Sequence, residues 1–239
     1  MKKIGIICAM RREEEQLLSR LHTHNTVQAG PFEFITGTLN GCEIILSQSG
    51  MGKVNAALNA LEMIKTFQPD FVLNSGVAGG LDGGLKTMDT VIGRQYVYHD
   101  VWCGDDGNEY GQVQGLPLFF EGDKTLLAAA EKLCAQNPQA VHLGLICTGD
   151  QFISGAAAVS KIRKRFPQAL ACDMESAAIA QTCYRYHIPF LSMRLISDVA
   201  GKEQTNFAQY ENFWLEMADT GFERTWALLM TLTRSVAYE

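Results

Sequence analysis

Carboxylate side chains stand at three places where a short apolar segment of the chain ends. Glu13 follows the segment 3–9, Glu175 follows 169–173, and Asp198 follows 190–196. Carboxyl groups can serve as general acids and bases. Glycosyl cleavage uses such groups, because one acid protonates the leaving group and one base activates water against an oxocarbenium-like carbon. The three positions suggest acid–base chemistry on a bond with a poor leaving group, but their spacing does not select that reaction.

Each carboxylate also has a purely structural interpretation. Glu13 lies in the first turn of an expected helix, where acidic side chains favour the helix dipole. Asp173 and Glu175 precede another expected helix, which Asp173 could cap. Arg194 and Asp198 flank the end of a buried segment and could form an ion pair, because a charge there is costly unless it pairs or meets a ligand. The residues alone leave both interpretations open.

A glycine-rich segment, Gly-Val-Ala-Gly-Gly at 76–80, follows the apolar segment 71–74. It is expected to form a turn whose free N–H groups could hold an anion or the edge of a base. It matches neither the dinucleotide-binding fingerprint nor the P-loop. Because glycine-rich turns also occur for packing reasons, the segment alone is a weak indicator of a site.

The elements that must position these residues alternate along the chain, which is typical of an α/β fold. Strands are expected at 3–9, 34–39, 43–48, 71–74, 90–98, 142–148, 169–173 and 190–196. Helices are expected at 12–21, 53–65, 124–136, 156–166, 176–186 and about 207–233. Asn40 and Gly41 predict a hairpin turn. Residues 99–120 read as a long loop, which in a compact domain is often functional. No repeat or linker is found, so we expect one domain over 1–239.

Composition narrows the functional classes. A net charge of -6 on 239 residues argues mildly against a nucleic-acid partner. The apolar stretch 4–10 is too short for a signal peptide, and no segment approaches the length of a membrane span. The 7 cysteines show no CxxC pair, and the 5 histidines have no metal-ligand spacing. We therefore expect a cytoplasmic protein with reduced thiols, no metal, no cofactor and no membrane partner.

Eight ordered segments carry a resemblance to a known family. They are Ile-Gly-Ile-Ile-Cys-Ala-Met (4–10) with Glu13, Ser-Gly-Met-Gly-Lys-Val-Asn-Ala-Ala (49–57), the glycine segment 76–80, Tyr-His-Asp (98–100), Glu-Tyr-Gly-Gln (109–112), Gly-Asp-Gln-Phe-Ile (149–153), Asp-Met-Glu (173–175) and Ser-Asp-Val-Ala (197–200). Together they resemble the bacterial 5'-methylthioadenosine/S-adenosylhomocysteine nucleosidases of the nucleoside phosphorylase superfamily. The resemblance implies a single-domain α/β fold with a central mixed, partly barrel-like β-sheet flanked by helices. It also implies hydrolysis of the N-glycosidic bond of adenine nucleosides: 5'-methylthioadenosine, S-adenosylhomocysteine and 5'-deoxyadenosine.

The resemblance also implies residue roles. Asp198 matches the acid that protonates N7 of adenine, and Glu13 matches the base that activates water. Glu175 matches the carboxylate that binds the ribose hydroxyls, Met174 packs under the sugar, and Phe152 stacks on adenine. An acid that must be protonated near neutral pH needs a raised pKa, which a closed pocket can supply.

Further substrate-binding positions follow from the same resemblance. They are Met10, Ala78, Gly79, Ile153, Asp173, Arg194, Ser197 and Phe207. Among them, Ile153 would offer backbone hydrogen bonds to the adenine edge, Arg194 would lie near the ribose and the water, and Ser197 would orient Asp198.

The loop 100–117 departs most from the family. The resemblance implies a homodimer in which this loop reaches the partner's pocket and walls the 5' end of the substrate with an aromatic pair. This chain has Asp106 and Asn108 at those positions. Since apolar surface needs apolar partners, one hypothesis is a 5' substituent more polar than methylthio. The alternative is that Trp102 rebuilds an apolar wall.

Two rival functions remain open. A phosphorylase of the same superfamily would use phosphate, but Arg11 and Arg12 lack the glycine-rich anion loop that such enzymes carry nearby. A nucleoside-binding module without catalysis would not require Glu13, Glu175 and Asp198 together. The expected partner is a small adenine nucleoside, and the phosphorylase alternative would act on a purine nucleoside.

Overall fold

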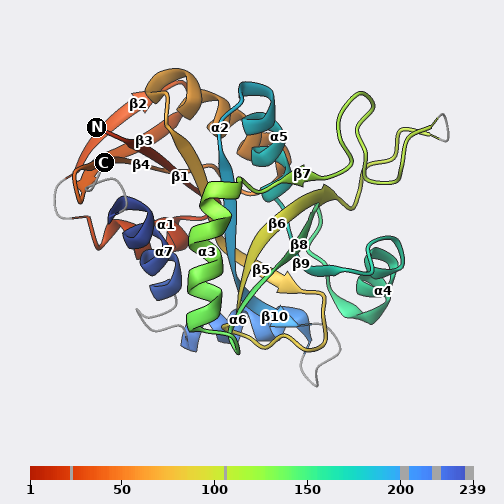
Figure 1. The fold of residues 1–239 in the computed structure, drawn as a ribbon. Coiled ribbons are helices and arrows are strands. Elements are labelled where there is room, and N and C mark those ends of the chain that lie inside the picture. The colour runs from red at the N-terminus through yellow and green to blue at the C-terminus, as the bar shows by residue number, and fades with distance from the viewer. Residues whose placement is uncertain (22–23, 105–106, 200–204, 217–221, 235–239) are drawn as a thin grey trace.

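The computed structural model describes residues 1–21, 24–104, 107–199, 205–216 and 222–234. Within these residues one mixed sheet contains β1 (Lys3–Cys8), β2 (His24–Ala29), β3 (Phe32–Leu39), β4 (Cys42–Gln48), β5 (Phe71–Gly80), β6 (Thr90–Tyr98), β7 (Phe120–Glu121), β8 (Val141–Thr148), β9 (Ala169–Asp173) and β10 (Phe190–Val199). The helices are α1 (Arg11–Leu18), α2 (Lys53–Phe67), α3 (Lys124–Gln136), α4 (Gly155–Arg165), α5 (Ser176–Tyr186), α6 (Asn206–Glu216) and α7 (Glu223–Arg234). Figure 1 gives their arrangement.

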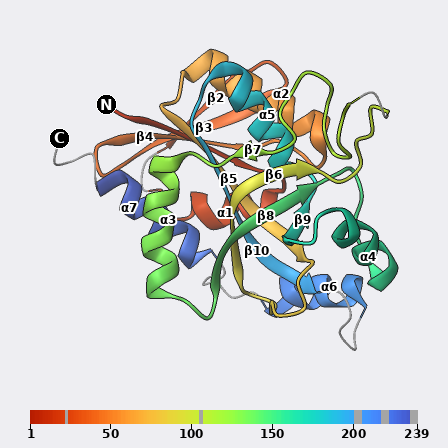
Figure 2. The same cartoon turned by 45° about the vertical axis from the view of Figure 1, so that its right-hand side comes forward.

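Five strands of the sheet close into a ring. β5 pairs with β10, β10 with β6, β6 with β8, β8 with β9, and β9 with β5 again. β1, β4, β3 and β2 extend from β5 as an open arm. Figure 2 shows the ring strands crossing beside α4 and α6. The expected α/β fold with a mixed, partly barrel-like sheet is confirmed.

The arm and the ring separate along one edge of β5. That edge pairs with β1 at Phe71–Asn74 and with β9 only from Gly79 onward. Between these pairings the backbone N–H of Val77 donates to the Glu13 carboxylate, at 2.9 Å. The fork between β1 and β9 is therefore filled by side chains at the place where the candidate carboxylates meet.

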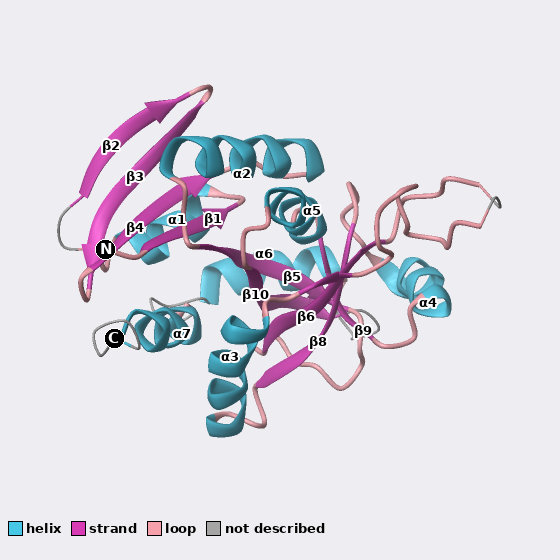
Figure 3. Ribbon diagram, turned by 45° about the horizontal axis from the view of Figure 1, so that its top comes forward, coloured by secondary structure: helices cyan, strands magenta, loops and turns pink. Residues whose placement is uncertain are grey.

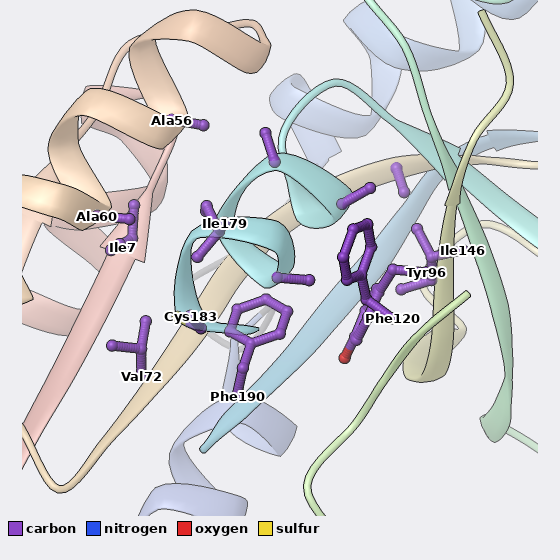
Figure 4. Packing of buried hydrophobic residues seen from close by; sticks show 14 of the residues in the cluster. Ile7, Ala56, Ala60, Val72, Tyr96, Phe120, Ile146, Ile179, Cys183 and Phe190 are labelled. Atoms are coloured by element: carbon purple, nitrogen blue, oxygen red, sulfur yellow. The ribbon is translucent and has the colours of Figure 1, made fainter. Parts of the chain in front are cut away.

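Both faces of the sheet are buried at β1 and β5. Ile7 and Val72 pack with α2 and α5 on one face, whereas Ile6 and Leu73 pack with α3 and α7 on the other. Figure 3 shows these helix pairs on opposite sides of the sheet, and Figure 4 shows the contacts of Ile7 and Val72. Strands buried on both faces carry continuous apolar runs, which is why they stand out in the sequence.

Three expectations about elements were wrong. β2 was missed, because His24–Ala29 is mostly polar and largely exposed at the edge of the sheet. The glycine segment 76–80 is the second half of β5 rather than a turn, and β10 continues through Asp198 to Val199. The expected helix 207–233 contains most of α6 and α7, and its residues 217–221 lie outside the described residues.

Among the described residues, no helix is long and apolar enough to cross a membrane.

Candidate active site

A cavity of about 480 Å³ opens where β5, β9 and β10 end. Twelve residues predicted for the site line it: Met10, Glu13, Ala78, Gly79, Phe152, Ile153, Asp173, Met174, Glu175, Ser197, Asp198 and Phe207. Six further lining residues were not predicted: Ala9, Met51, Val77, Gln151, Cys172 and Tyr210. The three carboxylates that are distant in sequence thus share one cavity.

Glu13 is held by backbone N–H groups. Its Oε2 accepts from Ala9 and Met10 at 2.9 Å each, and its Oε1 accepts from Val77 at 2.9 Å. Only 1% of the residue is exposed. Burial raises the pKa of Glu13, while Arg194 and these three N–H groups oppose the rise. Glu13 therefore joins the start of α1 to β5 and also faces the cavity, so the structural and chemical interpretations describe the same side chain.

Asp198 lies at an irregularity of β10. The register between β10 and β5 shifts between Ile196 and Asp198, and a bulge of this kind re-aims side chains. Ser197 Oγ donates to Asp198 Oδ1 at 2.8 Å, and Asn206 Nδ2 donates to Oδ2 at 2.7 Å. Burial raises the pKa of Asp198, and both donors oppose the rise. A Cβ at Gly79 would lie 3.4 Å from Oδ2, so glycine keeps the surroundings of the carboxyl open.

Glu175 faces the cavity from the turn before α5. Its Oε1 accepts from the backbone N–H of Gly52 at 2.9 Å, and its Oε2 lies 3.4 Å from Arg194 Nη2. Burial raises the pKa of Glu175, and Arg194 opposes the rise. The contact with Gly52 ties Glu175 to the turn that begins α2.

Arg194 lies beneath the cavity and is not among the residues that line it. It is fully buried and forms ion pairs with Asp173, at 2.8 Å, and with Glu175. The prediction of an ion pair between Arg194 and Asp198 is therefore wrong. Its Nη2 also donates to Asn74 Oδ1. A guanidinium in this place compensates two buried carboxylates at once.

Asp173 is saturated by protein partners. Besides Arg194, its carboxylate accepts from Thr148 Oγ1 at 2.6 Å and from the backbone N–H of Ser176 at 3.3 Å. Ser176 lies in the first turn of α5, so Asp173 does serve the start of that helix, although Glu175 is the N-cap residue. Asp173 lines the cavity, but its carboxylate oxygens bind Arg194, Thr148 and the first turn of α5.

Aromatic rings cover the mouth of the cavity. Phe152 meets the rings of Phe207 and Tyr210 edge-on, with centroids 6.5 and 5.8 Å apart. Tyr210 in turn contacts Trp214 at 6.0 Å. The spacing of 207, 210 and 214 on one helix was the available signal for Tyr210, because residues three and four apart share a helix face. Together these rings form an apolar wall suited to a flat base.

The loop residues predicted for the 5' pocket lie elsewhere. Trp102 is 51% exposed and stacks on Tyr110, with centroids 5.9 Å apart. Neither Trp102 nor Asn108 lines the cavity of its own chain, and Asp106 falls outside the described residues. In Figure 1 the loop extends away from the sheet.

Among the described residues, no cluster of three or more His, Cys, Asp or Glu side chains has a geometry that could hold a metal ion.

Comparison with known proteins gives consistent matches over almost the whole chain. The family model described as the phosphorylase superfamily matches residues 3–230. A 5'-methylthioadenosine/S-adenosylhomocysteine nucleosidase from Colwellia psychrerythraea 34H, solved with adenine, is 38% identical with a TM-score of 0.88, covering 97% of this chain and 94% of its own.

Two further solved structures have TM-scores close to this value. The nucleosidase of the same name from Neisseria meningitidis, solved with methylthio-immucillin-A, is 36% identical with a TM-score of 0.89, over 98% of this chain and 100% of its own. The futalosine hydrolase of Helicobacter pylori strain 26695 is 30% identical with a TM-score of 0.88, over 95% and 97%.

Proposed function

This chain belongs to the phosphorylase superfamily, as a member of its 5'-methylthioadenosine/S-adenosylhomocysteine nucleosidases, and on that premise we propose that it hydrolyses the N-glycosidic bond of adenine nucleosides. The candidate substrates are 5'-methylthioadenosine, S-adenosylhomocysteine and 5'-deoxyadenosine. The observation that carries the proposal is the meeting of Glu13, Glu175 and Asp198 in one cavity with an aromatic wall. The products are adenine and the corresponding ribose.

Asp198 is the proposed general acid, which allows the base to leave. The neutral acid gives its proton to N7 of adenine as the bond between C1' and N9 breaks, so the bonding electrons leave on an uncharged purine. The raised pKa of Asp198 supports this role, because a buried acid can remain protonated nearer neutral pH. Phe152 supplies the apolar face on which the base rests, and Tyr210 closes its outer side.

Glu13 is the proposed general base, which activates the attacking water. As positive charge develops at C1', water adds there and gives a proton to the Glu13 carboxylate. The reaction therefore ends with Asp198 ionised and Glu13 protonated, and exchange with solvent restores both. Three backbone N–H groups fix the Glu13 carboxylate, which supports a well-aimed base, since positioning lowers the entropic part of a barrier.

The sugar is assigned to Glu175, which would accept hydrogen bonds from the 2'- and 3'-hydroxyls. Arg194 holds Glu175 from below without entering the cavity. In this arrangement Arg194 and Asp173 act on the substrate indirectly, by fixing and charging Glu175. Met174 lies in the cavity wall beside Glu175 and supplies an apolar surface for the ribose.

Phosphate is disfavoured as the attacking species. None of the described residues that line the cavity is Lys or Arg, whereas phosphate sites use such side chains. Arg11 pairs with Glu15 on the surface and Arg12 lies over the Trp214 ring. The Glu13 carboxylate would repel an anion that approached the sugar from its side.

The deciding experiment is an assay of base release in phosphate-free buffer. The purified protein is incubated with methylthioadenosine, adenosylhomocysteine, 5'-deoxyadenosine, adenosine and inosine, and free base is measured by chromatography. We expect adenine release without phosphate, and a loss of about 10²-fold or more in kcat for Asp198→Asn. Release only after phosphate is added would contradict hydrolysis, and tight binding without cleavage would identify a binding module.

The 5' end of the substrate is proposed to lie against a neighbouring subunit. Trp102 is exposed and outside its own cavity, which supports a homodimer in which the loop 100–117 reaches the partner's pocket. Asp106 and Asn108 support a 5' substituent more polar than methylthio. If Trp102 instead provides an apolar wall, Trp102→Ala will raise the KM for methylthioadenosine. An unchanged KM removes that alternative, and light scattering gives the subunit number.

A reducing, cytoplasmic compartment is also proposed. All 7 cysteines are free thiols, and Cys103 is exposed. Exposed thiols persist where the surroundings are kept reduced.

A further inference from the structure

The first residue of α6 reaches the candidate acid directly. Asn206 is 5% exposed, and its Nδ2 donates to Asp198 Oδ2 at 2.7 Å. At its other end, Asn206 Oδ1 accepts from the backbone N–H of Gly155, the first residue of α4, at 3.0 Å. Ser154, the N-cap residue of α4, provides no side-chain cap. One amide therefore joins Asp198 to the beginnings of α4 and α6.

The orientation of this amide is determined by its partners. A backbone N–H can only donate, so the amide oxygen must face Gly155 and the NH2 group must face Asp198. An amide NH2 group has no lone pair to accept with, so Oδ2 of Asp198 must be the accepting oxygen. The Ser197 hydroxyl at Oδ1 can turn, because it also lies 3.3 Å from the carbonyl oxygen of Ala78. In the neutral acid, Oδ1 is therefore the oxygen that carries the proton.

The same helix supplies the cover of the cavity. Gln209 bonds both the N–H and the C=O of Val199, at 3.0 and 3.1 Å, so α6 is docked along the end of β10. Asn206 and Gln209 are three residues apart and share one face of α6. Phe207 and Tyr210 form the neighbouring face and line the cavity. The aromatic cover and the hold on the acid are thus parts of one rigid element.

From this geometry we propose that Asn206 is a positioning residue for the reaction. With α6 docked, it fixes the plane of the Asp198 carboxyl group and assigns the transferable proton to Oδ1. The acid is then in its working orientation only when the helix that covers the base is in place. The inference rests on the proposed function, since it concerns the acid of that reaction.

Other titratable groups around Asp198 carry no competing charge near neutral pH. Cys172 on β9 and Tyr210 on α6 face it, and burial raises the pKa of both, so both stay neutral. Across the cavity lies Glu13, whose partners are separate from those of Asp198. Among these carboxyl groups, Asn206 therefore donates to Asp198 and not to Glu13, and its other contact is the uncharged N–H of Gly155. Because it stabilises the charged form, its removal raises the pKa of Asp198 further.

The test is the pH profile of kcat/KM for adenine release by the whole protein. This ratio reports the pKa values of the free enzyme, and its high-pH limb belongs to Asp198, which must be protonated. In Asn206→Ala we expect that limb to move up by about one pH unit. Because the carboxyl loses its fixed plane, kcat should fall by about tenfold with little change in KM.

Two further variants make the result specific. Thr205→Ala removes the hydroxyl that accepts from the N–H of Ala208 at 3.2 Å, which loosens the start of α6 without touching Asp198. Its high-pH limb should stay at the wild-type position. Asn206→Asp keeps the size and the acceptor for Gly155 but sets a second carboxyl against Asp198, so its limb should move up further than that of Asn206→Ala.

The outcomes separate the two proposals. A high-pH limb in Asn206→Ala and Asn206→Asp that coincides with that of Thr205→Ala overturns the role of Asn206. If Asn206→Ala does not fold, Asn206→Asp alone decides by the same comparison. If the wild-type protein releases no adenine, the proposed function itself fails, whatever the variants do.

Discussion

Glu13 meets two requirements that oppose each other. As the proposed base it must be ionised, yet burial raises its pKa, with Arg194 and three backbone N–H groups limiting the rise. Activity should therefore fall on the acid side at a pH above the ordinary Glu value of about 4.3. The measurement is the low-pH limb of kcat/KM, with Glu15→Gln as the control because Glu15 is exposed. A limb at or below the ordinary value would contradict the effect of burial.

Arg194 is the residue whose loss should harm the fold most. Arg194→Met leaves Asp173 and Glu175 buried without their cation. Breaking a buried pair in this way costs about 3–5 kcal/mol. Arg11→Met breaks the exposed pair with Glu15 and should leave the free energy of unfolding close to that of the wild type, because solvent screens this pair. Urea unfolding of the two variants and the wild type measures both values, and equal losses would show that the buried network is not needed for stability.

Among the elements, the second half of β5 is fitted to two charged side chains. A Cβ at Gly76 would lie 2.6 Å from Arg194 Nη1 and 2.7 Å from Glu13 Oε1. Gly76→Ala should therefore displace both groups and lower kcat/KM by about 10²-fold. Gly83→Ala is the matched control, because a Cβ there meets nothing within 4 Å. The pair is compared by steady-state kinetics, and a fully active Gly76→Ala would refute the close fit.

The sequence predicts an element well when the element has a capping residue at its end and a regular apolar pattern along its buried face. The bounds of α3 agree with the prediction because Asp123 caps it through Thr125 and Leu126, and apolar residues mark its buried face. The expected strand stops at Asn74 because glycines usually indicate turns, whereas in β5 Gly76 makes room for Glu13 and Arg194. β2 has no apolar pattern, since its side chains are mostly exposed.

The sequence predicts the residues that line the cavity better than it predicts the position of Arg194. Glu13, Glu175 and Asp198 stand at strand ends, and twelve of the predicted residues line the cavity. The place of Arg194 beneath it depends on partners from two segments distant in sequence: Asn74 in one, and Asp173 with Ser176 in the other. No spacing in the sequence encodes such a set, because only the folded sheet brings these segments together.

At the scale of the whole molecule, buried acids make stability depend on pH. Burial raises the pKa of Asp198, so the folded chain holds this proton more tightly than the unfolded chain does. The stability that this provides is complete at low pH and is lost as the pH rises through the folded-state pKa. Asp198→Asn has no such loss.

The Tm of Asp198→Asn minus that of the wild type should therefore be more positive at about pH 8 than at about pH 4, near the ordinary pKa of Asp. Differential scanning fluorimetry at constant ionic strength measures the two differences. The Arg11→Met variant serves as control, because its exposed side chain pairs with Glu15, and it should give the same small difference at both pH values. Equal differences for Asp198→Asn would contradict the prediction.

The fork in the sheet has a consequence for how such an enzyme can diversify. The proposed base, Glu13, belongs to the open arm, through β1 and α1. The proposed acid, Asp198, lies in a strand of the closed ring, and Glu175, the proposed contact of the sugar, follows another. With these proposed roles, we expect mutations at the start of α1 to alter the choice of nucleophile while recognition of the nucleobase is inherited unchanged.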